Sequence, residues 1–300
     1  MHKIPGEHIY EGILMPGYHP PEIIEIFKNF QMHQSDCLVT AYPKSGQTWI
    51  TEMVSLILHH QNLEEASRQP IFSRVFWPDF CHAGRVSHSY LKKIASSSAP
   101  RLLKTHMLYR YLPKQSQQKR VPMIHVLRNP KDVAVSYYHF YRSNALFGKF
   151  RGSWDEFFNL FISGHVAYGS YFDYVLEYWN ECKENSNVLF LKYEEMLTDP
   201  REAVVKISQF LGKTLSSVSM EKIVNYTSFD SMKKNPATRI SAITDAIDES
   251  VSPFYRKGMV GDWRNYFTEQ QNTIFEKTFR EKMDGSGLSF DFGTNVTSKM

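Results

Sequence analysis

Cysteine is scarce in this sequence of 300 residues. Only Cys37, Cys81 and Cys182 are present, and they are too few and too scattered for a disulfide framework or a thiolate metal site. The first residues also lack the apolar core of a signal peptide. We therefore expect a protein of a reducing compartment, the cytoplasm.

Long hydrophobic runs and a marked excess of one charge are lacking as well. No uncharged apolar stretch approaches the ~20 residues that a membrane-spanning helix needs, so no membrane partner is expected. Lysine and arginine number 35 against 31 aspartate and glutamate, a difference of +4. So small and evenly spread an excess argues against a nucleic-acid partner but is compatible with a local basic pocket for an anionic ligand.

The composition is that of one globular domain. Hydrophobic residues make up 42% and aromatic residues 14%, enough for a substantial core, and no internal repeat divides the chain. We expect a single domain over residues 1–300. Residues 1–35 combine a Pro- and Gly-rich opening with a short helical pattern at 23–30, and are expected to wrap over the core as a surface segment.

A strand, a tight loop and a helix are predicted between residues 37 and 59. An apolar run that includes Val39 is interrupted at Pro43 and Gly46, and apolar residues then recur at helical spacing from Ile50 onward. The start of a helix presents unpaired N–H groups and a positive dipole end, to which Lys44 adds a full charge. The loop is therefore a candidate anion site.

The nucleotide-binding P-loop matches this loop only in part. Its pattern, G-x-x-x-x-G-K-[ST], requires an earlier glycine and a lysine after the second glycine, whereas Lys44 here precedes Gly46. The loop alone leaves two interpretations open: a phosphate-binding loop, or an ordinary strand-to-helix turn with a solvated lysine.

Three more strand patterns occur, at residues 101–105, 123–127 and 188–192, with helical patterns between them. Cap residues mark helix starts at Asn129, Ser153, Asp199 and Thr268. This alternation predicts an α/β fold with a central parallel sheet flanked by helices on both faces. Ligands bind such sheets at the edge formed by the carboxyl ends of the strands.

Three polar residues follow predicted strands directly and should meet at that edge: Lys44, His106 and Arg128. Histidine has the proton affinity to deprotonate a hydroxyl, and arginine can bind a phosphate through two parallel hydrogen bonds. Lys104 would add a second cation. The alternatives are a buried, hydrogen-bonded histidine and a surface salt bridge from Arg128 to Asp132 or another acid.

Basic and aromatic residues nearer the C-terminus fit a nucleotide. Arg256 and Lys257 precede Gly258, which can bring backbone close to a ligand. Tyr193 and residues 227–229 can stack on or hydrogen-bond a nucleobase. Taken singly, each of these residues is equally well explained by packing or solvation.

In their order and spacing these motifs resemble those of the cytosolic sulfotransferase family, and the resemblance covers nearly the whole chain. That family moves a sulfuryl group from 3′-phosphoadenosine 5′-phosphosulfate (PAPS) to hydroxyls or amines. The matching segments are residues 42–46 with Thr48 and Trp49, 104–106, 128–132 with Ser136, 192–195, 256–258 and 261–263.

The resemblance implies a PAPS-dependent sulfotransferase. It would act on a small apolar acceptor such as a phenol, a steroid or another alcohol, and would release PAP and a sulfate ester. His106 would be the general base, and Lys44 would stabilise the leaving phosphate oxygen. Lys104 would neutralise the sulfuryl oxygens, and Ser136 would complete the catalytic set. The P-loop-like strand, loop and helix would hold the 5′-phosphosulfate without a metal ion.

The same resemblance implies the binding residues. Trp49 would stack on adenine, while Arg128, Ser136 and residues 256–258 would hold the 3′-phosphate. The full cofactor set is Lys44, Ser45, Gly46, Gln47, Thr48, Trp49, Arg128, Ser136, Tyr193, Thr227, Ser228, Phe229, Met232, Phe254, Tyr255, Arg256, Lys257 and Gly258. The acceptor set is apolar and aromatic: Pro43, Phe76, Trp77, Phe80, Lys104, His106, Phe140, Tyr141 and Phe147. Residues 235–253 resemble the mobile lid of relatives.

The chain departs from the family pattern at two places. Gln47 stands where relatives commonly carry Thr, so an amide contact to the cofactor should replace a hydroxyl contact and change the affinity. The family's dimer motif, K-x-x-x-T-V-x-x-x-E, is poorly matched and supports a homodimer only weakly. Its motif positions are occupied here by Arg264, Thr268, Glu269 and Thr273.

Two other functions fit parts of the sequence. A nucleoside or small-molecule kinase shares the strand, loop and helix, but it requires the full glycine pattern and a magnesium-binding acid. A non-catalytic carrier of apolar molecules would keep the fold without needing His106 and Lys44. The sulfotransferase hypothesis accounts for both residues.

Overall fold

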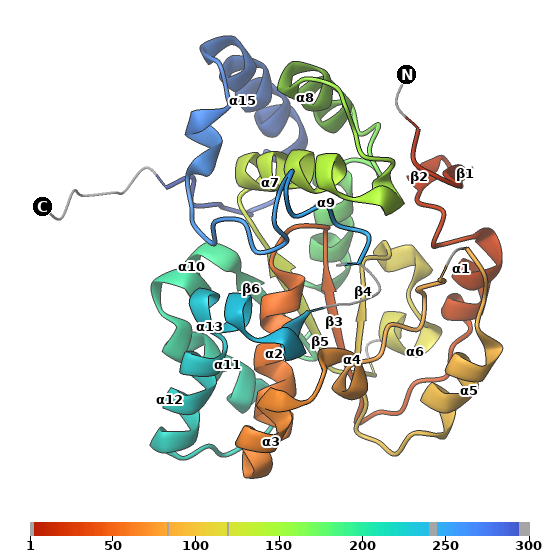
Figure 1. The fold of residues 1–300 in the computed structure, drawn as a ribbon, viewed down its shortest axis with the longest axis vertical. Helices are drawn as coiled ribbons and strands as arrows, with labels where there is room; N and C mark the ends of the chain where they lie inside the picture. The colour runs from red at the N-terminus through yellow and green to blue at the C-terminus, as the bar shows by residue number, and fades with distance from the viewer. Residues whose placement is uncertain (1–2, 83, 119, 240–244, 294–300) are drawn as a thin grey trace, which may run out of the picture.

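Four parallel strands form the centre of the computed structural model, which describes residues 3–82, 84–118, 120–239 and 245–293 (Figure 1). They are β3 (Cys37–Ala41), β4 (Leu102–Thr105), β5 (Met123–Leu127) and β6 (Val188–Lys192), in the spatial order β4-β3-β5-β6. Every residue of β3, β4 and β5 is buried, as expected for apolar strands of a sheet covered on both faces. The predicted α/β fold with a central parallel sheet is confirmed.

The register of the sheet brings the strand ends together. Thr40 of β3 pairs with Thr105 of β4 on one side and with His125 of β5 on the other, and Leu127 of β5 pairs with Lys192 of β6. The segments that follow the four strands therefore leave the sheet at one edge.

Helices flank the sheet (Figure 1). Helix α2 packs against α11 and α12, whereas α9 packs on β5, where the rings of Tyr178 and His125 are stacked 4.1 Å apart. Helices α8 and α9 both contact α15. The bounds are α2 (Gln47–Leu58), α7 (Pro130–Ser143), α8 (Trp154–Ile162), α9 (Tyr171–Cys182), α10 (Tyr193–Thr198), α11 (Pro200–Phe210), α12 (Ser217–Tyr226), α13 (Phe229–Lys234) and α15 (Glu269–Met283).

The predicted cap residues begin their helices as expected. Asn129 Oδ1 accepts from the backbone N–H of Lys131 at 2.9 Å at the start of α7. Ser153 forms a complete capping box with Glu156 at the start of α8, and Asp199 caps α11. Thr268, the one dimer-motif residue that the chain retains, caps α15 in a capping box with Gln271.

The N-terminal segment contains more structure than the sequence predicted. It forms a hairpin of β1 (His8–Tyr10) and β2 (Ile13–Met15) before α1 (Pro21–Lys28). Its inner face belongs to the core, because Ile24, Phe27 and His19 are 0% exposed. The segment that we expected to wrap over the core thus packs one of its faces into it.

Short helices complete the described part of the chain. They are α3 (Leu63–Arg68), α4 (Ile71–Arg74), α5 (His88–Ser96), α6 (Lys114–Gln117) and the 3₁₀ turns η1 (His60–Asn62), η2 (Tyr109–Tyr111), η3 (Ala145–Phe147), η4 (Pro236–Thr238) and η5 (Asp262–Asn265). Among the helices that the structure describes, none has the length and apolarity to cross a membrane.

A buried ion pair joins the starts of β3 and β4. Arg101 Nη2 lies 2.5 Å from Asp36 Oδ2, and the two side chains are 1% and 0% exposed. Arg101→Met leaves the carboxylate buried without its cation, so the free energy of unfolding, measured in urea, should fall by about 3–5 kcal/mol.

An exposed ion pair provides the matched control for that experiment. Arg110 pairs with Glu177 at 2.7 Å and is 49% exposed, so Arg110→Met should cost less than about 1 kcal/mol. Equal losses of stability in the two variants would contradict the stabilising role of the buried pair.

Candidate active site

The loop between β3 and α2 is wound tightly at the carboxyl edge of the sheet. Lys44 has φ of 69° and Gly46 has φ of 98°, both in the left-handed region. A Cβ at Gly46 would lie 2.7 Å from the Tyr193 ring, so no other residue fits there without a shift. The loop thus brings its backbone against Tyr193 and turns at once into α2.

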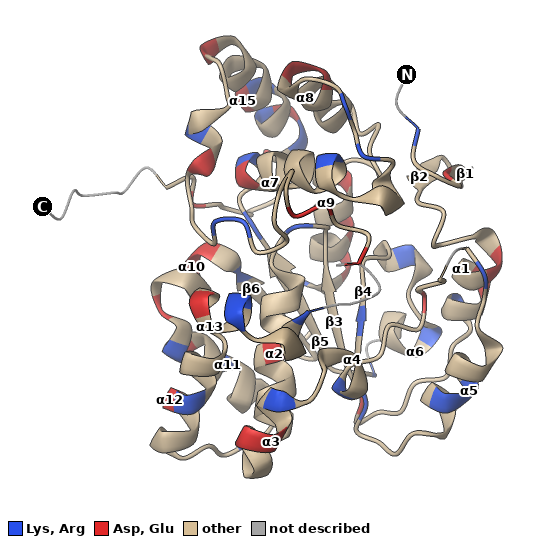
Figure 2. Ribbon diagram, in the orientation of Figure 1, with Lys and Arg blue, Asp and Glu red and all other residues tan. Residues whose placement is uncertain are grey.

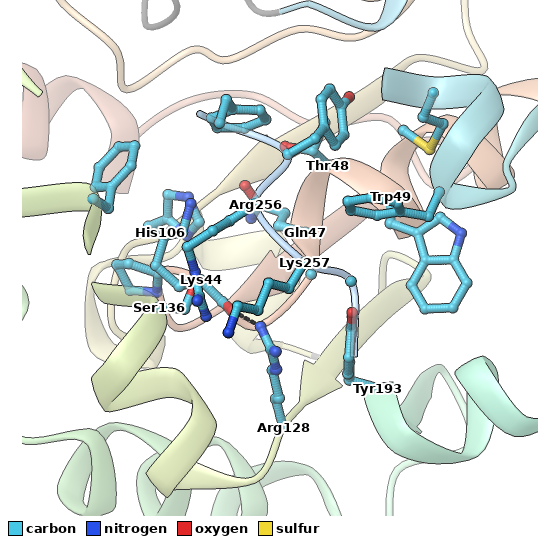
Figure 3. Close-up of a pocket in the computed structure, with 18 of the residues that line it drawn as sticks. Lys44, Gln47, Thr48, Trp49, His106, Arg128, Ser136, Tyr193, Arg256 and Lys257 are labelled. Carbon is cyan, nitrogen blue, oxygen red and sulfur yellow. Dashed lines mark hydrogen bonds between the residues drawn. The ribbon is translucent and has the colours of Figure 1, made fainter. Parts of the chain in front are cut away.

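Basic side chains converge beside this loop. Arg128 donates from Nη1 to the carbonyl of Lys44 at 2.9 Å and lies over the Tyr193 ring at 4.1 Å. Arg256 and Lys257 both pair with Asp262, at 2.6 and 2.5 Å. Together with Lys44 they make four basic side chains, and Figure 3 shows all four pointing toward one region. Figure 2 shows basic segments gathered between α7 and α10, while elsewhere both signs of charge are interspersed.

Four buried polar atoms in this region have no hydrogen-bond partner in the described structure. They are Ser45 Oγ, Trp49 Nε1, Arg128 Nε and Arg256 Nε. Buried donors are normally paired because an unpaired one costs free energy. Such a concentration of donors next to four cations fits a site for an anionic ligand with several oxygens.

Burial shifts the charge state of Lys44. Its amine lies 4.3 Å from the Phe140 ring and 4.8 Å from the Phe254 ring. This burial, helped by the charges of Arg128 and Arg256, lowers the pKa of Lys44 to about 7. A bound phosphate would favour the charged amine and raise the pKa again.

The hydrogen bonding of His106 fixes which of its ring nitrogens carries the proton. Its Nδ1 lies 2.7 Å from the carbonyl oxygen of Ala41, which can only accept, so Nδ1 carries the proton and Nε2 keeps its lone pair. Burial, reinforced by the charges of Lys104 and Lys44, lowers the pKa of His106 to about 3. The ring is therefore neutral near pH 7, as a proton acceptor must be.

Lys104 lies on the same side as His106. It is 2% exposed, its Nζ lies 4.1 Å from the Trp77 ring, and burial lowers its pKa to about 7. The wall around these two residues is aromatic, with Phe140 and Phe147 completing it. One end of the pocket thus combines a neutral imidazole and a lysine amine with apolar surface.

Most of the predicted site residues line this one pocket. From the cofactor set they are Lys44, Gly46, Gln47, Thr48, Trp49, Arg128, Ser136, Tyr193, Thr227, Phe229, Met232, Phe254, Tyr255, Arg256, Lys257 and Gly258. From the acceptor set they are Pro43, Trp77, Lys104, His106, Phe140 and Phe147. Sequence reasoning missed Tyr18, Leu197 and Met259, for which no motif provided a signal.

Five predicted residues do not line the pocket. Tyr141 follows Phe140 by one position on α7, which turns its side chain into the core, where its hydroxyl accepts from Ala167 N at 2.7 Å. Phe80 lies against Trp77, with ring centres 4.6 Å apart, and Phe76 also lies outside the lining. The hydroxyl of Ser45 is buried, and Ser228 caps α13.

Gln47 lines the pocket, but its amide nitrogen is already engaged. Nε2 donates to the carbonyl of Thr105 at 2.5 Å and reaches that of Val39 at 3.4 Å. The side chain therefore ties the start of α2 to the end of β4. The predicted amide contact to the cofactor is not favoured for this nitrogen.

The predicted lid, residues 235–253, lies partly outside the described residues, because 240–244 are not described. On its C-terminal side, Asp248 N donates to the carbonyl of Ser143 at 2.7 Å, and Ala145 N donates to that of Ala246 at 2.8 Å. These bonds hold the segment against the end of α7. Its mobility stays a prediction.

Comparison with known proteins gives a consistent result. The family model described as "Sulfotransferase domain" matches residues 34–287. The chain is 42% identical to sulfotransferase 1A1 of Bos taurus over 270 residues, which is 90% of each chain. The chain belongs to the sulfotransferase family.

Solved structures agree with this sulfotransferase in fold. The structure of mouse sulfotransferase SULT7A1 complexed with PAP has a TM-score of 0.77 and 33% identity, with 94% of this chain and 95% of that chain covered. Retinol dehydratase in complex with androsterone and PAP has a TM-score of 0.81 at 24% identity, with 93% and 89% covered, and shows likeness of fold alone.

The depressed pKa of Lys44 predicts proton uptake when PAP binds. At pH 8 most Lys44 amines are neutral in the free protein, and a phosphate beside the amine restores its charge, so binding should take up on the order of one proton. Calorimetric titrations in two buffers of different ionisation enthalpy measure the number of protons.

A second pH value and a variant test whether Lys44 is the source of the proton uptake. At pH 5.5 Lys44 is already charged, so its uptake should vanish. Lys44→Arg, which keeps a permanent charge, should lower the uptake at pH 8. An uptake that is the same in this variant, or the same at both pH values, would rule out Lys44 as its source.

Proposed function

We propose that this sulfotransferase transfers the sulfuryl group of PAPS to a hydroxyl, or an amine, of a small apolar acceptor and releases PAP. The observation that carries the proposal is the division of one pocket. One part gathers four cations and unpaired donors, and the other holds His106 with a free Nε2 among aromatic rings. The two parts meet at Lys44 (Figure 3).

The residues present fit an adenosine bisphosphate. The loop from Lys44 to Thr48 would hold the 5′-phosphate through backbone N–H groups at the start of α2. Arg128, Ser136 and Arg256 would hold the 3′-phosphate, using guanidinium N–H groups that are unpaired in the protein. When bound, PAPS supplies the sulfuryl group.

The adenine would lie against aromatic rings. Trp49 and Tyr193 meet edge to face with centres 5.4 Å apart, and Phe229 and Met232 line the same part of the pocket. A Cβ at Gly258 would lie 2.2 Å from the Phe229 ring, so this glycine lets the basic segment pass close to the base site.

The protein's own groups would move and hold the proton. His106 Nε2 would take the proton of the acceptor hydroxyl, and the Ala41 carbonyl would stabilise the imidazolium through Nδ1–H. Lys44 would stabilise charge that develops on the leaving phosphate oxygen, and Lys104 charge on the sulfuryl oxygens. The aromatic wall would exclude water from both.

The aromatic walls near His106 limit the kind of molecule that can serve as the acceptor. The walls formed by Trp77, Phe140 and Phe147 favour a flat or apolar molecule such as a phenol or a steroid. The three cysteines are buried and are not joined by disulfides, which suits the reducing cytoplasm that we propose as the location of the protein.

The proposed reaction predicts sulfated product from PAPS with at least one member of a panel of phenols, steroids, alcohols and amines. Activity should be unchanged by a chelator, since the proposed roles are all filled by protein side chains. Product is measured by mass spectrometry. Phosphorylated product from ATP, with no product from PAPS, would instead favour the kinase alternative.

His106→Ala tests the base. Removal of a general base should lower kcat by about 10²–10⁴, while the affinity for PAP, measured by calorimetry, should stay within about threefold because His106 lies on the acceptor side. Phe76→Leu, next to the site but outside the pocket lining, is the control and should keep most of the activity. Retention of most activity by His106→Ala would remove His106 from this role.

A further inference from the structure

The N-terminal segment contributes one polar residue to the aromatic wall of the pocket. Tyr18 lies between β2 and α1, is 7% exposed, and lines the pocket together with His106. Its ring lies 6.0 Å from that of Phe147 and 6.2 Å from that of Trp77. Tyr18 thus forms part of the wall of the pocket on the side that would receive the acceptor.

The hydroxyl of Tyr18 begins a buried chain of hydrogen bonds. Tyr18 Oη lies 2.9 Å from Tyr168 Oη, which lies 2.9 Å from His19 Nε2. On the other side of the imidazole, His19 Nδ1 lies 2.6 Å from the carbonyl oxygen of Asp79. Tyr168, His19 and Asp79 are at most 1% exposed, so water does not interrupt the chain.

The far end fixes the direction of every bond in this chain. A carbonyl oxygen can only accept, so His19 Nδ1 carries the proton of the neutral ring. Burial lowers the pKa of His19 to about 3, which keeps the ring neutral and leaves Nε2 as an acceptor. Tyr168 must then donate to His19, and because each hydroxyl has one proton, Tyr18 must donate to Tyr168.

One consequence concerns the oxygen of Tyr18. Its only proton is committed to Tyr168, so toward any further group it offers lone pairs alone. An ether or carbonyl oxygen brought against it would meet a second acceptor, whereas an O–H or N–H group would find a partner. Burying a donor without a partner costs free energy, so the difference affects affinity.

We propose that Tyr18 is a specificity-determining residue that accepts a hydrogen bond from a second donor group on the acceptor molecule. The favoured substrates are then apolar, commonly aromatic molecules that carry a further O–H or N–H besides the group that is sulfated. This inference rests on the proposed function, because it assigns the sulfated group to His106 and the second donor to Tyr18.

The test compares diols with their monomethyl ethers at increasing distance between the two oxygens. Suitable pairs are resorcinol with 3-methoxyphenol, and 4,4′-dihydroxybiphenyl with its monomethyl ether. The measured quantity is the ratio of kcat/KM within each pair, halved for the two equivalent hydroxyls of the diol. For the pair whose spacing fits, the wild-type ratio should be about 3–10 in favour of the diol.

Three variants distinguish specificity from packing. Tyr18→Phe removes the oxygen, so the ratio should fall to about one, whereas lost packing would lower both rates and leave the ratio unchanged. Tyr168→Phe keeps the Tyr18 hydroxyl but removes the group to which it donates, so Tyr18 can then donate to an ether oxygen. The kcat/KM of the ether should rise, and the ratio should again fall. Tyr109→Phe, which loses a hydroxyl bond to the Gln117 carbonyl outside the pocket lining, should leave the ratio unchanged.

The inference is overturned if no pair shows a preference for the diol, or if Tyr18→Phe keeps the wild-type preference. Failure of the proposed function would look different, since no phenol would then be sulfated with PAPS by any variant. In that case the same pairs would be compared by calorimetric binding. A diol preference that Tyr18→Phe removes would still support the role of Tyr18, and an unchanged preference would still overturn it.

Discussion

The hydrogen bond between His106 and the carbonyl of Ala41 joins the two parts of the site. It exists because β3 and β4 are neighbours in parallel register, so that the residue after one strand meets the last residue of the other. The same strand, β3, continues into the loop that carries Lys44. His106, which follows β4, and the loop that follows β3 are therefore held at the ends of two neighbouring strands of one sheet.

This arrangement has an energetic cost. Lys44 and Lys104 are surrounded by aromatic rings, and burial moves the pKa of each to about 7. Arg256 and Lys257, by contrast, share the carboxylate of Asp262, which offsets part of their mutual repulsion. The protein thus keeps some cations paired and others poorly solvated, and an anion of several charges would satisfy both groups at once.

Much of this architecture could be predicted from the sequence, because it depends on local rules. The strands were visible as apolar runs, and Asn129, Ser153 and Thr268 begin their helices as cap residues do. Most of the residues that line the pocket were named by the family resemblance that the motifs carry, and not by local rules.

The errors came from tertiary packing. Nothing in the sequence distinguishes Phe140, which lines the pocket, from Tyr141, which enters the core, until the rotation of α7 is known. Tyr18 could not be found either, since it reaches the site only because residues 1–35 pack their inner face into the core.

The positions of the tryptophans allow ligand binding in the pocket to be followed by fluorescence. Of the five tryptophans, Trp49 lines the part with the basic cluster and Trp77 lines the part with His106. The other three, Trp154, Trp179 and Trp263, are absent from the pocket lining and lie near α8, α9 and η5. Two variants, one that keeps only Trp49 and one that keeps only Trp77, would each report on one part of the pocket by the fluorescence of a single residue. Comparing the two emission signals during binding would show the order in which the two ligands arrive.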